Sequence, residues 1–201
     1  MSIWGFLLNV IAIYMQVFAI MDPLGVVPIY IGLTENLDLE DRKRLIKHVF
    51  NVSVVLIIIF TLAGKWILDF FGISIPAVRF GGGILLMAIA IDMLGGLPKA
   101  KQVESEELAT VPLATPLLVG PGTITTLILL VTKYTVIEVL VGSLAVALTT
   151  FYIFLYADKV LDYLGRGFIR TLARIMAVIV AAIAAEMIFS AIEEWYINLF
   201  I

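Results

Sequence analysis

The stretch Asp22-Pro23-Leu24-Gly25-Val26-Val27-Pro28 interrupts the first long apolar run of this chain. A proline inside a helix has no backbone N–H and leaves the carbonyl four residues earlier without its partner. Hydrocarbon accepts such polar groups only where protein covers them or where they line a cavity. The stretch therefore predicts a membrane helix that is broken beside a protected site.

A second stretch of the same kind, Thr115-Pro116-Leu117-Leu118-Val119-Gly120-Pro121, follows 93 residues later. At this shift the residues Pro23, Leu24, Val26 and Pro28 match Pro116, Leu117, Val119 and Pro121, and Leu68, Asp69 and Gly72 match Leu161, Asp162 and Gly165. At a shift of 94 the residues Ala88, Ile89, Ala90 and Met93 match Ala182, Ile183, Ala184 and Met187, with Asp92 opposite Glu186. Three regions in nearly one register indicate an internal repeat.

The composition indicates an integral membrane protein, because 62% of the residues are hydrophobic and only 14% are charged. A helix needs about 20 apolar residues to cross the bilayer core. Such runs lie near residues 4–33, 45–68, 73–94, 110–132, 136–157 and 174–198. The first has neither a preceding basic region nor a small-residue cleavage site, so we expect a retained helix. We therefore predict an all-α membrane protein with six transmembrane helices.

The repeat predicts how these helices are organised. Each half holds three helices, and an odd number makes the second half enter the membrane upside down. We expect residues 1–95 to form the first repeat, 96–111 a cytoplasmic linker and 112–201 the second repeat of one membrane domain. A 3+3 inverted-topology repeat with discontinuous helices 1 and 4 is the plan of many secondary transporters.

Basic residues predict the orientation, since cytoplasmic loops collect Lys and Arg. Ten of the thirteen follow helices 1, 3 and 5, namely Arg42, Lys43, Arg44, Lys47, Lys99, Lys101, Lys159, Arg166, Arg170 and Arg174. Lys65, Arg79 and Lys133 fall at the opposite ends. We therefore expect both termini outside a cell (plasma) membrane that the chain crosses several times.

The two breaks are the candidate substrate site. A restarted helix points N–H groups and a positive dipole end at the gap, which suits a carboxylate, while freed carbonyls suit an ammonium group. A gap that offers both fits a small zwitterion such as a short amino acid. The candidate residues are Asp22, Pro23, Leu24, Gly25, Leu117, Val119, Gly120, Pro121, Gly122 and Thr123. The alternative is that Asp22-Pro23 and Thr115-Pro116 are N-cap and N1 pairs that restart kinked helices.

Three acids within or beside the apolar spans are candidates for proton coupling, because burying an acid is costly without a function. Asp22 lies inside a break and is the first choice, although it could serve only as an N-cap. Glu186 is the second choice for its depth. Asp92, near Gly95 and a polar loop, has the alternative role of a salt bridge or an interfacial anchor.

Several classes of function have no signature in this chain. We find no His-Glu-x-x-His, Gly-x-Ser-x-Gly or P-loop pattern, so we expect neither an enzyme nor an ATP-driven pump. No cysteine is present to form a disulfide or a thiolate metal site, and we expect no cofactor. No large basic surface predicts nucleic-acid binding. A channel or an exporter for another small solute remains the alternative, because broken helices line pores too.

The motifs that carry these predictions also carry a family resemblance. The opening Asp22-Pro23-Leu24-Gly25 with Pro28, the later Gly120-Pro121-Gly122-Thr123-Ile124 and the six-helix plan resemble the MarC family of membrane proteins along the whole chain. The resemblance implies a proton-linked carrier of glycine, alanine and similar amino acids. Val26 stands where many members of the family have Asn, which bears on specificity.

Overall fold

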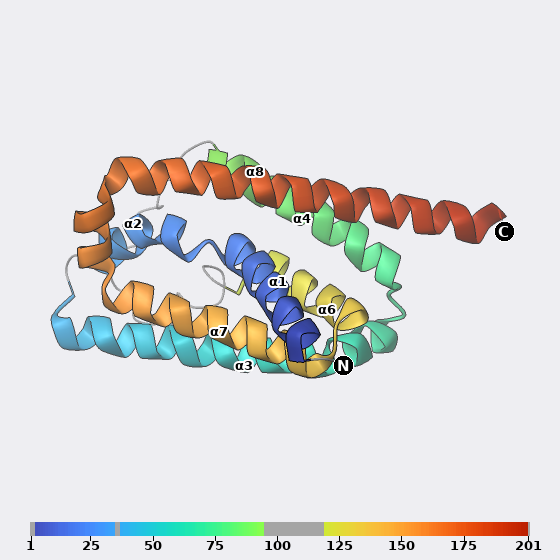
Figure 1. Cartoon of the computed structure of the whole chain (residues 1–201), viewed down its shortest axis with the longest axis horizontal. Coiled ribbons are helices and arrows are strands. Elements are labelled where there is room, and N and C mark those ends of the chain that lie inside the picture. The colour runs from blue at the N-terminus through green and yellow to red at the C-terminus, as the bar shows by residue number, and fades with distance from the viewer. Residues whose placement is uncertain (1–2, 35–36, 95–118, 201) are drawn as a thin grey trace.

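The computed structural model describes residues 3–34, 37–94 and 119–200, and these residues form an all-helical protein (Figure 1). The helices are α1 (Ile3–Met21), α2 (Pro23–Thr34), α3 (Leu39–Phe71), α4 (Ile75–Leu94), α6 (Pro121–Lys133), α7 (Val136–Leu155) and α8 (Ala157–Phe200). Five stretches are long and apolar enough to cross a bilayer: Ile3–Val27, Leu39–Phe71, Ile75–Leu94, Val136–Leu155 and Gly167–Ile197. The protein is therefore a helical membrane protein, as its composition predicted.

The helix bounds differ from the predicted runs in two places. The run expected over 110–132 is described only from residue 119 onward, where α6 forms its last part, and the linker expected over 96–111 lies outside the described residues. The connection expected before residue 174 is helical, because α8 already begins at Ala157. Gly165 within α8 has the non-helical angles φ 75° and ψ 149°, which a glycine adopts at little cost, so α8 consists of two helices that meet at a kink.

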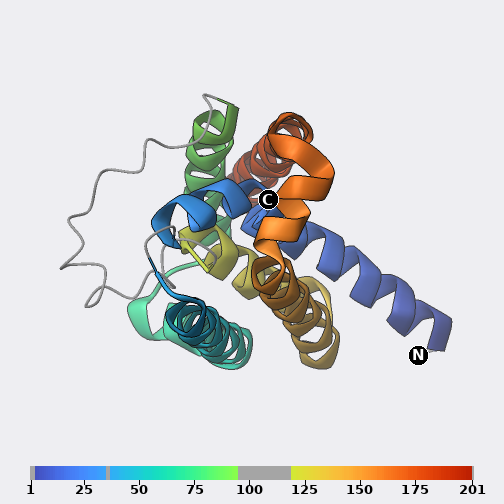
Figure 2. The same ribbon diagram turned by 90° about the vertical axis from the view of Figure 1, so that its left-hand side faces the viewer.

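The helices pack in antiparallel pairs (Figure 1). α3 runs beside α7, and α4 packs against α8, while α1 and α6 contact helices of both pairs. Both termini lie toward one end of the bundle, on the right in Figure 1, with the turns before α4 and α7. We call this the terminal end. The opposite end, with the segment between α2 and α3 and the turn between α7 and α8, is the loop end; Figure 2 views the molecule from that side.

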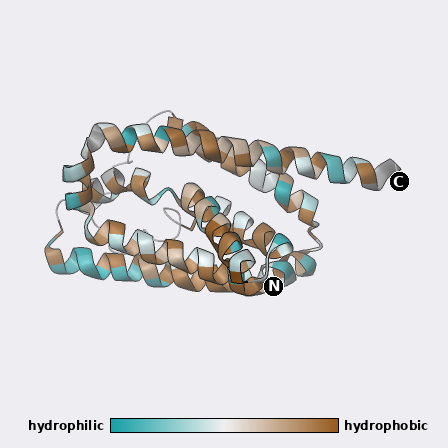
Figure 3. Ribbon diagram, viewed as in Figure 1, coloured by the Kyte–Doolittle hydropathy of each residue, from teal (hydrophilic) through white to brown (hydrophobic). Residues whose placement is uncertain are grey.

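The core follows helical stripes of buried residues. On α3 the buried positions include Ile46, Val49, Ser53, Ile57, Thr61 and Gly64, and the residues 93 positions later, Val139, Gly142, Val146, Thr150, Phe154 and Ala157, are buried as well. Leu86 and Ala90 of α4 are buried against Val180 and Ala184 of α8, which are 94 positions later. Hydrophobic residues also cover much of the outer helix surfaces (Figure 3), as lipid contact requires.

Small residues let the helices approach closely. A Cβ added to Gly83 of α4 would lie 2.9 Å from the Ala184 carbonyl oxygen of α8. A Cβ added to Gly142 of α7 would lie 2.7 Å from Ile13 Cγ2 of α1. Membrane helices associate through such contacts, because lipid leaves no hydrophobic force between them. The glycines of α4 and α7 therefore allow close contact of α4 with α8 and of α7 with α1.

Candidate functional site

The first break occupies one residue. α1 ends at Met21 and α2 begins at Pro23, and Asp22 between them has φ 38°, a left-handed conformation that is uncommon outside glycine. The Asp22 N–H still donates to the Phe18 carbonyl at 2.9 Å, and the Val26 N–H donates to the Asp22 carbonyl at 3.2 Å. The chain therefore changes direction at Asp22 while hydrogen bonds continue on both sides.

The Asp22 side chain caps the helix that it starts. It is only 7% exposed, and its Oδ1 accepts the Gly25 N–H at 3.2 Å. Together with Pro23 at the first helical position this is the N-cap and N1 pair that the sequence offered. Gly25 makes the arrangement possible, because a Cβ at this position would meet the Asp22 carboxylate. Capping and burial thus place one carboxyl group at the start of α2.

The second helix start has a different cap. α6 begins at Pro121, after Gly120 in an extended conformation (φ −78°, ψ −178°), and the Ile124 N–H donates to the Gly120 carbonyl at 3.0 Å. Gly120 has no side chain, so no N-cap side chain accepts the first-turn N–H groups here, in contrast with α2. The predicted site residue Leu117, with Thr115 and Pro116, lies outside the described residues.

The fold brings parts of the two motifs together. Met21 and Val27, on either side of the first break, belong to the same buried core as Val119, which is 1% exposed. Pro23 is buried and Leu24 is partly buried. Residues beside both helix starts therefore belong to one buried core.

The residues that follow Pro121 pack against other helices. Gly122 faces α4, since a Cβ there would lie 2.6 Å from Leu86 Cδ2. Thr123 is buried, and Thr126 bonds back to the Gly122 carbonyl at 2.8 Å. Thr126 thus bonds back to its own helix, as threonines in helices often do.

The three candidate acids lie in different surroundings. Asp22 is buried at the break, whereas Asp92 is exposed near the last turn of α4. Glu186 of α8 is exposed and lines a separate open cavity. The structure therefore places only Asp22 at the two helix starts.

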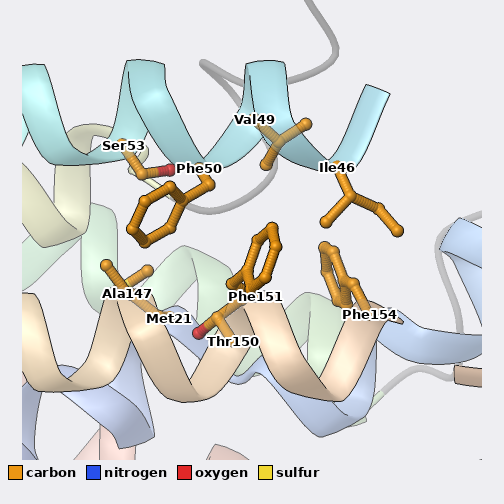
Figure 4. A pocket seen from close by; sticks show the side chains of 9 residues that line it. All are labelled: Met21, Ile46, Val49, Phe50, Ser53, Ala147, Thr150, Phe151 and Phe154. Carbon is orange, nitrogen blue, oxygen red and sulfur yellow. The ribbon is translucent and has the colours of Figure 1, made fainter. Parts of the chain in front are cut away.

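At the loop end, aromatic side chains close the interior. A cavity of about 10 Å³ lies between Met21, Ser53, Phe50, Phe151 and Phe154 (Figure 4), which is room for about one water molecule. The rings of Phe50 and Phe151 are 5.2 Å apart. The Ser53 hydroxyl has no hydrogen-bond partner among the described residues.

Further contacts hold the same end together. Tyr30 of α2 stacks on Phe154 of α7 with a centroid distance of 4.8 Å. Arg42 of α3 donates from Nε to the Thr34 carbonyl at 2.8 Å and pairs with Asp158 of α8 at 3.4 Å. These contacts join four helices, so the loop end is closed.

At the terminal end, a cavity of about 470 Å³ opens between α1, α4, α6 and α8. Its polar lining includes Gln16, Arg79, Thr126, Lys133, Glu186 and Ser190, and Leu129, Ile183 and Met187 are among its apolar residues. Arg79 pairs with Glu194 at 2.9 Å. The cavity therefore lies between these four helices in the half of the bundle nearer the terminal end.

Sequence reasoning missed a fourth acid, Glu138 of α7, which is 1% exposed. Its carboxylate accepts the Asn9 amide at 2.8 Å, the Thr135 N–H at 2.8 Å and the Thr135 hydroxyl at 2.7 Å. The spacing Thr135-x-x-Glu138 is that of a capping box, which could have predicted it. Glu138 fastens α1 to the start of α7.

These features define a multi-pass helical membrane protein whose first apolar run is interrupted at a buried aspartate. The chain belongs to the MarC family: the family described as "MarC family integral membrane protein" matches residues 7–196. This confirms the resemblance that the two motifs predicted. No solved structure matches this chain.

Relatives of nearly the same length exist in archaea and bacteria. The "UPF0056 membrane protein MJ1677" of Methanocaldococcus jannaschii is 39% identical over 90% of this chain and 94% of its own. The "UPF0056 membrane protein PH0760" of Pyrococcus horikoshii is 35% identical over 90% and 92%. The "UPF0056 membrane protein YvbG" of Bacillus subtilis is 30% identical over 93% and 95%. These names record a membrane protein and no activity.

Proposed function

We propose that the protein is a proton-coupled secondary transporter of small neutral amino acids such as glycine, alanine and serine, which works by alternating access. In its motifs it resembles the small neutral amino acid transporter SnatA. The observation that carries the proposal is the buried Asp22 at the break, whose neighbours Met21 and Val27 belong to the same core as Val119 of the second motif. A membrane protein keeps a buried acid at such a position for a function.

We infer that the two halves are an inverted repeat with interrupted helices 1 and 4. The burial pattern supports this, because six buried positions between Ile46 and Gly64 recur 93 residues later between Val139 and Ala157. The directions of the helices support it too: α3 and α7 run in opposite directions, as do α4 and α8 (Figure 1). In transporters of this plan the substrate binds at the interface of the repeats.

The two helix starts suggest how the substrate is oriented. The amide groups at the start of α6 lack an N-cap side chain, so they are the better partners for a substrate carboxylate. The Asp22 carboxylate is an acceptor for the substrate's ammonium group. In this arrangement Gly25 and Gly120 keep side chains out of the space between the two starts.

The difference between the two ends supports alternating access over a continuous channel. The loop end is closed by aromatic stacking and by the Arg42–Asp158 pair, while the terminal end holds an open cavity. The loop end also carries Arg42, Lys43, Arg44 and Lys47, so we place it in the cytoplasm and both termini outside the cell membrane. The structure then corresponds to an outward-open state.

Asp22 is the proposed proton carrier, with Glu186 as the second candidate and Asp92 as the third. Asp22 is buried beside the proposed substrate position, so its protonation would alter the charge that the substrate meets. Asn is as good an N-cap as Asp. The Asp22→Asn variant should therefore keep the hydrogen bond from Gly25 and lose only the titrating proton.

The test is uptake of labelled glycine into proteoliposomes with an imposed pH gradient, a sodium gradient or neither. We expect accumulation only with the pH gradient, its loss in Asp22→Asn, and counterflow in the wild type. Glu186→Gln, measured in parallel, tests the second candidate. Uptake that follows sodium alone, or proton-driven accumulation that persists in Asp22→Asn, would contradict this coupling, and flux without saturation or counterflow would indicate a channel.

A further inference from the structure

We propose that the open cavity at the terminal end is a second, outer binding site for zwitterionic amino acids, with Lys133 binding the carboxylate and Glu186 the ammonium group. The inference rests on the proposed transport function. In it the substrate binds first in this cavity, which we call the capture site, and then moves to the site at the break. The cavity, at about 470 Å³, lies within the range of roughly 300–1,000 Å³ common for small-molecule sites. It therefore has room for a short amino acid with several water molecules.

The cavity is lined by charges of both signs. Lys133, in the last turn of α6, and Glu186 of α8 both line it. Arg79 lines it as well, but its charge is compensated by Glu194 at 2.9 Å. Among the described residues no carboxylate pairs with Lys133 and no cation pairs with Glu186. Lys133 Nζ lies 5.5 Å from the centroid of the Tyr134 ring, so in the described part of the chain its neighbour is an aromatic ring and not a carboxylate.

The remaining lining fits the backbone of an amino acid better than a long apolar molecule. Gln16, Thr126 and Ser190 add hydrogen-bonding groups, which a zwitterion can use from either end. Met187 and Ile183 give the cavity an apolar wall that would accept a small side chain. Charges near an open mouth mainly raise the rate of encounter, because they are partly solvated.

The capture site would feed the deeper one. Thr126 lines the cavity and lies on the same helix as Thr123, which is buried one turn nearer the start of α6. A substrate held at the cavity is therefore next to the helix whose N-terminus is proposed to bind its carboxylate. Loss of capture should raise KM and leave kcat unchanged, since a change of this kind removes only uniform binding.

The first experiment measures glycine uptake in proteoliposomes for Lys133→Gln and Glu186→Gln. Both should raise KM about tenfold, equal to about 1.4 kcal/mol, with kcat unchanged. Lys65→Gln on α3 and Glu193→Gln on α8 are matched controls, because these exposed residues do not line the cavity. Their KM should equal that of the wild type, and melting curves of all four variants should show intact protein.

A second measurement assigns the two charges separately. Glycinamide keeps the ammonium group of glycine and lacks the carboxylate. Glycinamide should therefore compete with glycine for uptake. Its inhibition should be weaker in Glu186→Gln than in the wild type, and equally strong in Lys133→Gln and the wild type. The same loss of inhibition in both variants would overturn the assignment of one charge to each residue.

The outcomes separate this inference from the proposed function. If the wild type takes up glycine and both cavity variants have the KM of the wild type, the capture site is wrong and the proposed transport function still stands. A fall in kcat or in proton coupling for Glu186→Gln at constant KM also overturns it, because Glu186 would then carry the proton. A wild type that takes up no amino acid overturns the proposed function, and the capture site with it.

Discussion

The loop end and the terminal end of the bundle are filled differently. At the loop end Val49 and Phe50 of α3 fill the space against α7. The residues 93 positions later, Gly142 and Ser143, lie toward the terminal end, and Gly142 leaves room for Ile13 of α1. Larger side chains thus fill the space at one end, and smaller ones let α1 pack against α7 at the other.

Cysteine accessibility should give the largest contrast between the ends, and the chain has no cysteine of its own. Ser190→Cys, in the open cavity, should react quickly with a polar maleimide in detergent micelles. Ser53→Cys, in the small closed cavity, should react roughly a hundredfold more slowly if local opening costs about 3 kcal/mol. Comparable rates at the two positions would show that the loop end opens freely.

The aromatic closure should dominate the stability of the loop end. Phe154→Ala removes a ring that is 3% exposed and stacked on Tyr30, so it should lower the free energy of unfolding by about 3 kcal/mol. A thermal unfolding curve should show a lower midpoint, and Ser53→Cys in this background should react faster. Phe70→Ala is the matched control, because Phe70 is 84% exposed. If both variants lost the same free energy of unfolding, the stacked rings would not be what stabilises the loop end.

The stability of the terminal end should depend on how many hydrogen bonds residue 138 can still accept. Glu138→Ala leaves the partly buried Asn9 amide and the Thr135 N–H without their acceptor and should cost about 1–2 kcal/mol of stability. Glu138→Gln keeps one acceptor oxygen and should cost less. Thermal unfolding of the two variants measures the difference, and an unaffected Ala variant would mean that other contacts seat α1 on α7.

The Arg42–Asp158 ion pair at the loop end should contribute least to the free energy of unfolding. Asp158→Asn removes the partner of Arg42, but the Asp158 side chain is 67% exposed, and such pairs contribute about 0–1 kcal/mol. Arg42 keeps its hydrogen bond to the Thr34 carbonyl. We expect a shift of the melting temperature that is small and vanishes at high salt. A large shift that persists in salt would make this pair a main element of the closure.

Local features of the site were predictable because they depend on neighbours in the chain. Asp22 and Pro23 form the expected N-cap and N1 pair, since a side chain and backbone N–H groups within three residues decide a cap. The last spanning stretch begins earlier than the run expected near 174–198. It starts at Gly167, after the kink at Gly165, and the residues from Ala157 to that kink are helical.

The sequence by itself determined the helical membrane class, the family and the position of the first break. Apolar length, local capping and proline chemistry decide these without reference to distant residues. Only the tertiary structure decided that Lys133 and Glu186 line one cavity and that Asn9 binds Glu138 across 129 residues. Such meetings depend on how helices cross, and the crossing is set by the summed packing of side chains that are far apart in the chain.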